Sequence, residues 1–242
     1  MVEIIIFIIF FLFSEKKKLK KTKKIKKMNE IETKTKNDIL KETESNIPIS
    51  AITFNRTWVF WENYIKKKGK LNWKDSYKKI FEFNDIITFF QFWNSYPGND
   101  IKNIFYNGNR IIYFFNEKYR INAMNIFEKG IEPMWEDEKN KGGKYLQFEY
   151  QIKKIESEDF CRVSSLTWKK LILNTMGENY PGSQFVNGLR FVDKTDFERG
   201  KIVLFRIEIW VNKFLSDDLL NQLKEFMMKQ MGCEVIEIKD IK

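Results

Sequence analysis

An aromatic side chain and a carboxylate stand next to each other in residues 130–141, which read GIEPMWEDEKNK. The indole of Trp135 has an electron-rich face that attracts a flat cation, and the adjacent Glu136 carries only hydrogen-bond acceptors when ionised. A ligand that suits both is a planar, positively charged ring with two N–H donors along one edge. A guanine methylated at N7 has these properties, so this segment predicts a site for a modified purine.

The composition excludes much enzyme chemistry. The chain of 242 residues contains no histidine, so it has no Ser-His-Asp or Cys-His arrangement and no histidine metal ligand. Its two cysteines, Cys161 and Cys233, have no CxxC spacing and support neither a disulfide framework nor a zinc site, which fits a reducing compartment. We therefore expect no catalytic residues, no metal and no cofactor.

One enzymatic alternative stays open at this point. Glu136, Asp137 and Glu138 could hold Mg²⁺ for phosphoryl or pyrophosphate chemistry, since carboxylates suit that ion. Three consecutive carboxylates do not readily converge on one ion, however, and Lys139 and Lys141 follow at once. The sequence disfavours this reading.

The positive charge is concentrated at the N-terminus. The formal net charge is +10, and residues 1–27 alone contain nine lysines and two glutamates, so the rest of the chain is only mildly basic. Such a domain should hold an anionic ligand through local clusters of charge, not through a general field.

The N-terminal segment combines an apolar run, residues 4–13, with a lysine-rich block, residues 16–27. The apolar run is shorter than the about 20 residues that cross a bilayer, and the order of charge and apolar residues does not fit a signal peptide. We expect residues 1–50 to be a disordered or non-native extension, with translation from Met28 as one explanation and a secretory or anchoring role as the less favoured one. A single domain over residues 51–242 should follow.

Strands and helices alternate without a regular βαβ order, which predicts an α+β fold: a mostly antiparallel sheet with helices on one face. Aromatic, β-branched or alternating runs predict strands from Thr53 and at 144–152, 202–211 and 235–238. Helical spacing with capping and stop residues predicts helices at 85–96, 158–176 and 216–231. Asn107-Gly108 predicts a hairpin inside the long segment 97–125.

Several motifs then occur in a familiar order, and together they resemble the eukaryotic translation initiation factor 4E family from Phe54 to the C-terminus. They are FNRTWVFW, LNWKDSY with Trp73, QFWNSY with Trp93, GIEPMWEDEKNK, Trp168 in the second helix and IEIW ending in Trp210. The resemblance implies a curved, mostly antiparallel eight-stranded sheet with three helices on its convex face. It further implies a cytoplasmic, non-enzymatic protein whose domain over residues 51–242 binds the 7-methylguanosine 5′ cap of mRNA and recruits it to the translation initiation machinery.

By this resemblance, Trp73 and Trp135 sandwich the methylated base, and Glu136 accepts hydrogen bonds from its N1–H and N2–H groups. Aligning Gly188 and Trp210 with their family counterparts places Lys194 and Arg206 where the family has cations for the cap phosphates. Strand alternation puts Arg190 on the face of Lys194, so Arg190 is a reserve candidate and Lys144 a further one. A longer loop between Lys194 and Arg206 leaves their register open.

The family also binds partners, either a scaffold factor of the 4G type or 4E-binding proteins, through positions that match Trp93, Leu173 and Gly177. We expect an exposed Trp93 indole beside a shallow apolar groove, with a core position for Trp93 as the less favoured alternative because its helix is apolar on nearly every side. Here Phe90 and Lys170 stand where the family typically has acidic residues, and Lys170 would repel a basic residue of the partner. The alternative function is therefore a 4E-like cap-binding translational repressor with altered scaffold binding. No membrane partner is expected.

Overall fold

The computed structural model describes residues 52–66, 72, 74–105, 119–153, 157–195, 202–231 and 235–241, which belong almost entirely to the unit Phe54–Lys242. Seven strands of this part form one sheet in the order β2-β1-β3-β5-β6-β4-β7. The strands are β1 (Thr53–Lys66), β2 (Tyr77–Asp85), β3 (Tyr119–Glu128), β4 (Lys144–Lys153), β5 (Val186–Asp193), β6 (Ile202–Val211) and β7 (Glu237–Asp240). The five pairings from β1 to β7 are antiparallel.

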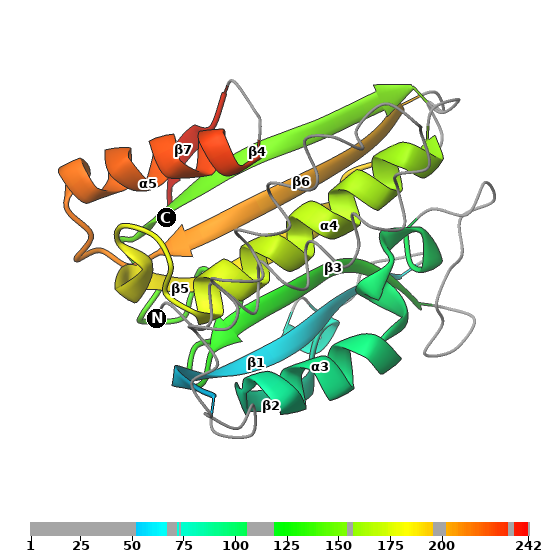
Figure 1. The fold of residues 1–242 in the computed structure, drawn as a ribbon, viewed down its shortest axis with the longest axis horizontal. Helices are drawn as coiled ribbons and strands as arrows, with labels where there is room; N and C mark the ends of the chain where they lie inside the picture. The colour runs from blue at the N-terminus through cyan, green and yellow to red at the C-terminus, as the bar shows by residue number, and fades with distance from the viewer. Residues whose placement is uncertain are drawn as a thin grey trace, which may run out of the picture. The chain divides into compact units, whose positions relative to one another are not determined.

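Three α-helices lie on one side of this sheet (Figure 1). They are α3 (Ile86–Ser95), α4 (Ser157–Met176) and α5 (Asp217–Met231). Four 3₁₀ turns accompany them: η2 (Lys74–Ser76), η3 (Pro97–Asn99), η4 (Ile101–Asn103) and η6 (Ser183–Phe185). The predicted α+β class is confirmed as a curved antiparallel sheet with three helices, although the described residues supply seven strands where eight were expected. In the part of the chain that the structure describes, no helix is both long and apolar enough to cross a bilayer.

Helix α3 shows how closely local chemistry fixes an element. The Asp85 carboxylate accepts hydrogen bonds from the Thr88 backbone N–H at 2.8 Å and from its hydroxyl at 2.7 Å, so Asp85 caps the helix. The same bonds lower the pKa of Asp85. At the other end the helix stops before Tyr96, whose backbone is extended. Tyr96 precedes Pro97, and the residue before a proline avoids the helical region. The predicted helix at 85–96 is thereby confirmed.

The other elements of the fold agree with the sequence prediction to different degrees. β1, β4, β6, α4 and α5 lie where the sequence placed them, and β7 begins two residues later than predicted. β2 and β3 were not predicted as strands, and β5 was given no range, although the alternation of Arg190 with Lys194 assumed a strand there. The predicted extension over residues 1–50 and the hairpin at Asn107-Gly108 lie outside the described residues.

Alternation along β6 gives the sheet two different faces. Phe205, Ile207 and Ile209 are fully buried, and Phe205 stacks on Phe160 of α4 with ring centroids 5.4 Å apart, so this side faces the helices. The alternate positions belong to the opposite side, where the register places mostly polar side chains from neighbouring strands next to one another. We call this side the polar face, defined by Asn125, Gln147, Glu149, Arg190, Arg206 and Glu208.

The buried Tyr180 makes the free energy of unfolding at high pH a test of packing on the helix side of the sheet. The Tyr180 hydroxyl lies 2.7 Å from that of Thr175, and burial raises the pKa of Tyr180 far above its ordinary value. The folded pKa exceeds the unfolded one, so this contribution to stability is complete below about pH 10 and is lost as the pH rises further.

Tyr180→Phe should therefore flatten the alkaline fall of the unfolding free energy, by up to about 1.4 kcal/mol per pH unit. At pH 7 the variant should lose only about 0.5–1.5 kcal/mol, the worth of one hydrogen bond. Urea unfolding at several values between pH 7 and pH 11 measures both effects. Parallel curves for the two proteins would contradict the buried, neutral phenol.

Candidate functional site

Trp135 and Glu136 lie in the connection between β3 and β4, residues 129–143, and both side chains are exposed. Trp135 is 54% exposed, whereas Trp58, Trp168 and Trp210 are fully buried. A large indole in water contributes little to the core. The loop therefore presents, on its surface, the aromatic face and the carboxylate that the sequence singled out.

The loop is held by buried amides. The Asn140 side chain is fully buried; its Nδ2 donates to the backbone carbonyls of Glu132 and Met134, both at 2.8 Å. Its Oδ1 accepts a hydrogen bond of 2.9 Å from Asn187 of β5, which also donates to the carbonyl of Lys139. Because every polar atom of the Asn140 amide has a partner, the backbone on either side of Trp135 is fixed to the sheet.

The three consecutive carboxylates of this loop have separate surroundings. Asp137 accepts from the backbone N–H groups of Glu132 and Lys139, at 2.8 and 2.9 Å, and so closes the turn. Glu138 pairs with Lys141. Within the described residues no group of three or more potential ligands gathers around one point. The magnesium alternative thus receives no geometric support from Asp137 and Glu138, which act in the loop itself.

Next to the loop, an aromatic cluster fills part of the sheet surface. Phe127, Ile131, Trp210 and Ile241 are buried together, with Trp61 and Tyr145 packed against them. The sheet allows this because position 188 is a glycine: a Cβ there would lie 2.4 Å from the Phe127 ring. Gly188 therefore makes room for the ring that supports the start of the loop.

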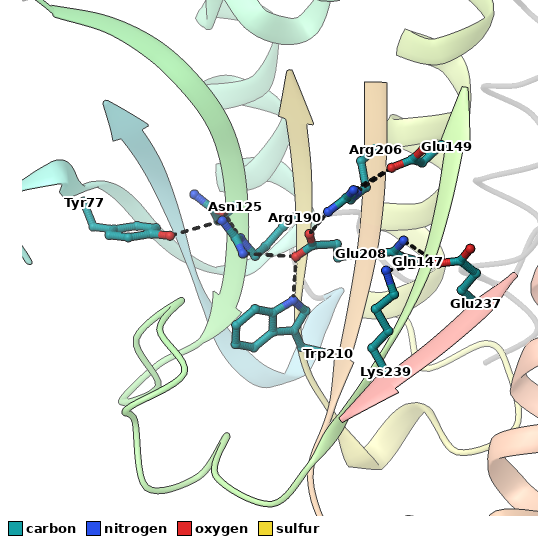
Figure 2. A network of polar contacts seen from close by, with 10 residues as sticks. All are labelled: Tyr77, Asn125, Gln147, Glu149, Arg190, Arg206, Glu208, Trp210, Glu237 and Lys239. Atoms are coloured by element: carbon teal, nitrogen blue, oxygen red, sulfur yellow. Dashed lines mark hydrogen bonds and ion pairs between the residues drawn. The ribbon is translucent and has the colours of Figure 1, made fainter. Parts of the chain in front are cut away.

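The polar face contains a buried ion pair at its centre. Arg190 of β5 donates to Glu208 of β6 at 3.0 Å, and the two side chains are 12% and 7% exposed. Arg190 also donates to Asn125 at 3.0 Å and to the Tyr77 hydroxyl at 3.1 Å, while Glu208 accepts from the Trp210 indole at 3.0 Å (Figure 2). Burial opposes the charge of Arg190, but the pKa of Arg190 is nevertheless raised, because Glu208 and Tyr77 stabilise the cation.

Tyr77 connects this network with the Trp135 loop. Burial raises the pKa of Tyr77; Arg190 opposes the rise, and the negative charges of Glu208 and Glu136 add to it. Glu136 is therefore close enough for its charge to act on the Tyr77 phenol. Tyr77 is the first residue of β2, four positions after Trp73 in the sequence.

Trp73 itself lies outside the described residues, so its pairing with Trp135 stays a prediction. The turn that follows it, η2, is anchored: Asn63 of β1 donates a 2.8 Å hydrogen bond to the Ser76 hydroxyl. β2 follows η2 directly, so Tyr77 is the residue of the polar network that is nearest to Trp73 in sequence.

Two of the four predicted phosphate ligands lie together on the polar face. Lys194 is exposed, and its backbone N–H donates to Leu204 at 2.9 Å, which extends the pairing of β5 with β6 beyond Asp193. The pKa of Lys194 is lowered, first by partial desolvation and then by the neighbouring positive charge of Arg206. Arg206 is partly exposed and donates to Glu149 of β4 at 2.9 and 2.6 Å.

The other two predicted ligands have different places. Arg190 is buried in the ion pair with Glu208, so it stabilises the polar face and is not accessible as a phosphate ligand. Lys144 precedes Tyr145 on β4 and therefore points to the helix side, where its ammonium pairs with Asp217 of α5 at 3.0 Å. We leave Lys144 out of the site, because the alternation of β4 separates it from Arg206.

The model of the family "Eukaryotic initiation factor 4E" matches residues 53–239, most of the chain. The chain belongs to the eukaryotic initiation factor 4E family. The resemblance inferred from the tryptophan motifs is thus confirmed.

Similar curated members of the 4E family include translation initiation factor 4E of Candida albicans, 27% identical over 161 residues, which cover 66% of this chain and 65% of that protein. Initiation factor 4E of Dictyostelium discoideum is 23% identical over 178 residues, 70% of this chain and 58% of that protein. The chain thus spans about three fifths of the length of these relatives.

Solved structures of the 4E family share the fold. A complex of Ascaris suum eIF4E-3 with m7G cap has a TM-score of 0.57 at 18% identity, over 78% of this chain and 91% of that one. A complex of C. elegans eIF4E-3 with the 4E-binding protein Mextli and a cap analog has a TM-score of 0.55 at 16% identity, with the same coverage.

The residues predicted to contact a 4E-family partner are less accessible than expected. Trp93 was expected to be exposed, but it is only 2% exposed: its ring stacks on Phe89, with centroids 5.7 Å apart, and meets the edge of Phe60. The expectation of an exposed indole is wrong and the alternative core position is the one observed, because α3 is apolar on nearly every side and buries Trp93. Leu173 is also 2% exposed, and only Gly177 is partly accessible.

Several residues of the site were not singled out by the sequence. Tyr77 ends the LNWKDSY motif but was given no role, and Asn125, Glu149 and Asn187 belong to none of the motifs. All four acquire a role only through the contacts that strand register creates. Glu208 gave a weak signal, as the acidic position between Arg206 and Trp210 in an alternating strand. A carboxylate that lies between an arginine and a tryptophan on one face of a strand is expected to accept hydrogen bonds from donors within the protein.

Proposed function

We propose that residues 51–242 form a cap-binding domain that binds the 7-methylguanosine 5′ cap of mRNA and recruits it to the translation initiation machinery. One observation carries the proposal: a fixed loop presents the Trp135 indole to solvent directly beside the Glu136 carboxylate. Membership of the 4E family and the cap complexes of related structures support it. The protein would act by binding alone, in the cytoplasm, without a catalytic step.

In the proposed complex the methylated base stacks on Trp135, with Trp73 on its other face. Stacking contributes roughly 1–3 kcal/mol per base, and the charge of the methylated ring adds about 2 kcal/mol when desolvated. Glu136 accepts from the N1–H and N2–H groups and thereby rejects adenine, whose edge would leave the carboxylate unpaired. Lys194 and Arg206 then face the phosphates on the polar face. The eight-strand count and the convex position of the helices stay predictions drawn from the family.

Retention on immobilised 7-methyl-GTP tests the proposal. The protein should be eluted by free 7-methyl-GTP and not by the same concentration of GTP, since only the methylated base is a cation. Glu136→Ala should weaken binding by roughly 10- to 100-fold through loss of two charge-assisted hydrogen bonds. Equal elution by the two nucleotides would contradict the proposed recognition of the methyl group.

The alternative role is translational repression: the protein would bind caps without productive contact to a 4G-type scaffold. Two observations favour it, the burial of Trp93 and the basic Lys170 in place of a family acidic residue. A scaffold fragment that carries the family's helical binding motif separates the two roles. If the cap-bound protein captures this fragment, it acts as an initiator; if it captures only 4E-binding proteins, it acts as a repressor.

A further inference from the structure

Arg206 already has an anionic partner within the site. Glu149 of β4 lies directly opposite Arg206 of β6 in the antiparallel register, and one carboxylate oxygen, Oε1, accepts from both Nε and a terminal nitrogen of the guanidinium, at 2.9 and 2.6 Å. Figure 2 shows this pair beside the buried ion pair of Arg190 with Glu208. The Nε edge of Arg206 is therefore occupied by a carboxylate.

The ion pairs Arg190–Glu208 and Arg206–Glu149 of the polar face differ in how readily they can open. Arg190 and Glu208 are 12% and 7% exposed, and each has further hydrogen bonds, so separating them leaves charge in a poorly hydrated place. Arg206 and Glu149 are 22% and 38% exposed. An ion pair in contact with water can be exchanged for another at little cost, because its net stabilisation is small.

A phosphate and a carboxylate compete for the same donors. A phosphate group can bind an arginine bidentately through its Nε edge, the pair of N–H groups that Glu149 now accepts from. The second carboxylate near this guanidinium, Glu208, lies 3.8 Å from its other terminal nitrogen and is committed to Arg190 and Trp210. Glu149 is therefore the group that competes with an incoming phosphate for the Nε edge of Arg206.

We propose that Glu149 occupies Arg206 in the free protein and yields it to a ligand phosphate, so that Glu149 determines how strongly binding depends on the phosphate chain. This inference rests on the proposed function and adds a residue that sets specificity. Arg190, Lys194 and Arg206 share the polar face with the carboxylates of Glu149 and Glu208, and Glu237 and Lys239 of β7 form a further ion pair on the same face. Neutralising Glu149 leaves Arg206 free for phosphate without touching the base-binding loop.

The test compares Glu149→Gln with the wild-type protein for three ligands: 7-methylguanosine, its monophosphate and its triphosphate. Glutamine keeps the size of the side chain and removes its charge. Calorimetry should show an unchanged Kd for the nucleoside and a Kd about two- to fivefold lower for the triphosphate, as expected for the loss of one competing ion pair. The triphosphate affinity of the variant should also fall more steeply with salt.

Glu237→Gln is the matched control. Glu237 lies on β7 opposite Gln147, accepts a hydrogen bond from Gln147 and pairs with Lys239. The contact with Lys239 lowers the pKa of Glu237, and the charge of Arg206 adds a smaller effect in the same direction. The variant Glu237→Gln loses the same charge as Glu149→Gln, but position 237 has no hydrogen bond to Arg206 in the described residues. The affinity of Glu237→Gln for the triphosphate should therefore change by less than the affinity of Glu149→Gln.

Two results would overturn the role of Glu149. Weaker triphosphate binding by Glu149→Gln would mean that Glu149 orients Arg206 instead of competing for it. An equal gain in both glutamine variants would mean that only the general charge matters. If the wild-type protein fails to bind even the nucleoside, the cap pocket itself is contradicted, which is a distinct result from either of these.

Discussion

Replacing Trp135 with alanine should weaken binding of 7-methyl-GTP by about 100- to 1,000-fold and leave the fold intact. Stacking and the cation–π attraction together contribute roughly 3–5 kcal/mol, which corresponds to at least two powers of ten in Kd. The fold should tolerate the change because the indole is 54% exposed and the loop is held by Asn140 and Asn187 instead. Calorimetric titration with 7-methyl-GTP measures the loss.

A matched control separates stacking from any general effect of an exposed aromatic. Phe214, 72% exposed in the connection between β6 and α5, is an even more accessible ring that the proposed site does not use. Phe214→Ala should leave the affinity within about twofold, while Trp135→Phe should recover part of it, because phenylalanine stacks but attracts cations less strongly than indole. If Trp135→Ala binds as tightly as the wild-type protein, base stacking on this residue is ruled out.

The sequence predicted the elements whose signals are local. The helix at 85–96 carried its own cap, Asp85, and its own stop, Pro97, and β6 alternated cleanly between apolar and polar residues. β2 and β3 lacked such signals. β2 is at one edge of the sheet and most of its positions are at least partly exposed, so its apolar residues do not alternate regularly. β3 buries Asn125 on the polar face, where a polar residue interrupts the pattern of a buried strand.

The residues of the candidate site also differ in whether local sequence could predict them. Trp135 and Glu136 are neighbours in sequence, so a motif could find them. Arg190, Glu208 and Glu149 come from three strands, and only the register between β5, β6 and β4 brings their side chains together. Sequence alternation could say that Arg190 and Lys194 share a face, but not that Glu208 stands opposite Arg190 and withdraws it from the ligand. The register is set by long-range packing, which single-chain patterns do not contain.

Breaking the buried ion pair of Arg190 with Glu208 should strongly reduce the stability of the fold. Arg190→Met should lower the free energy of unfolding by about 3–5 kcal/mol, because it leaves the Glu208 carboxylate in a poorly hydrated place without its main cation. The loss should be nearer the lower end of this range, since the Trp210 indole still donates to Glu208 at 3.0 Å and Arg206 lies 3.8 Å away. Urea unfolding, followed by tryptophan fluorescence, measures the change.

The double variant decides whether the charge pair or the shape of the face matters. Glu208→Gln keeps an acceptor for Trp210 and removes the buried charge, so adding it to Arg190→Met should restore most of the lost stability; replacing both members of a buried pair is often close to neutral. The two single losses should then exceed the loss of the double variant by more than 1 kcal/mol, the coupling expected of residues in contact. Additive losses would instead mean that Arg190 stabilises the sheet through Asn125 and Tyr77, with which it also bonds, and that Glu208 is a passive neighbour.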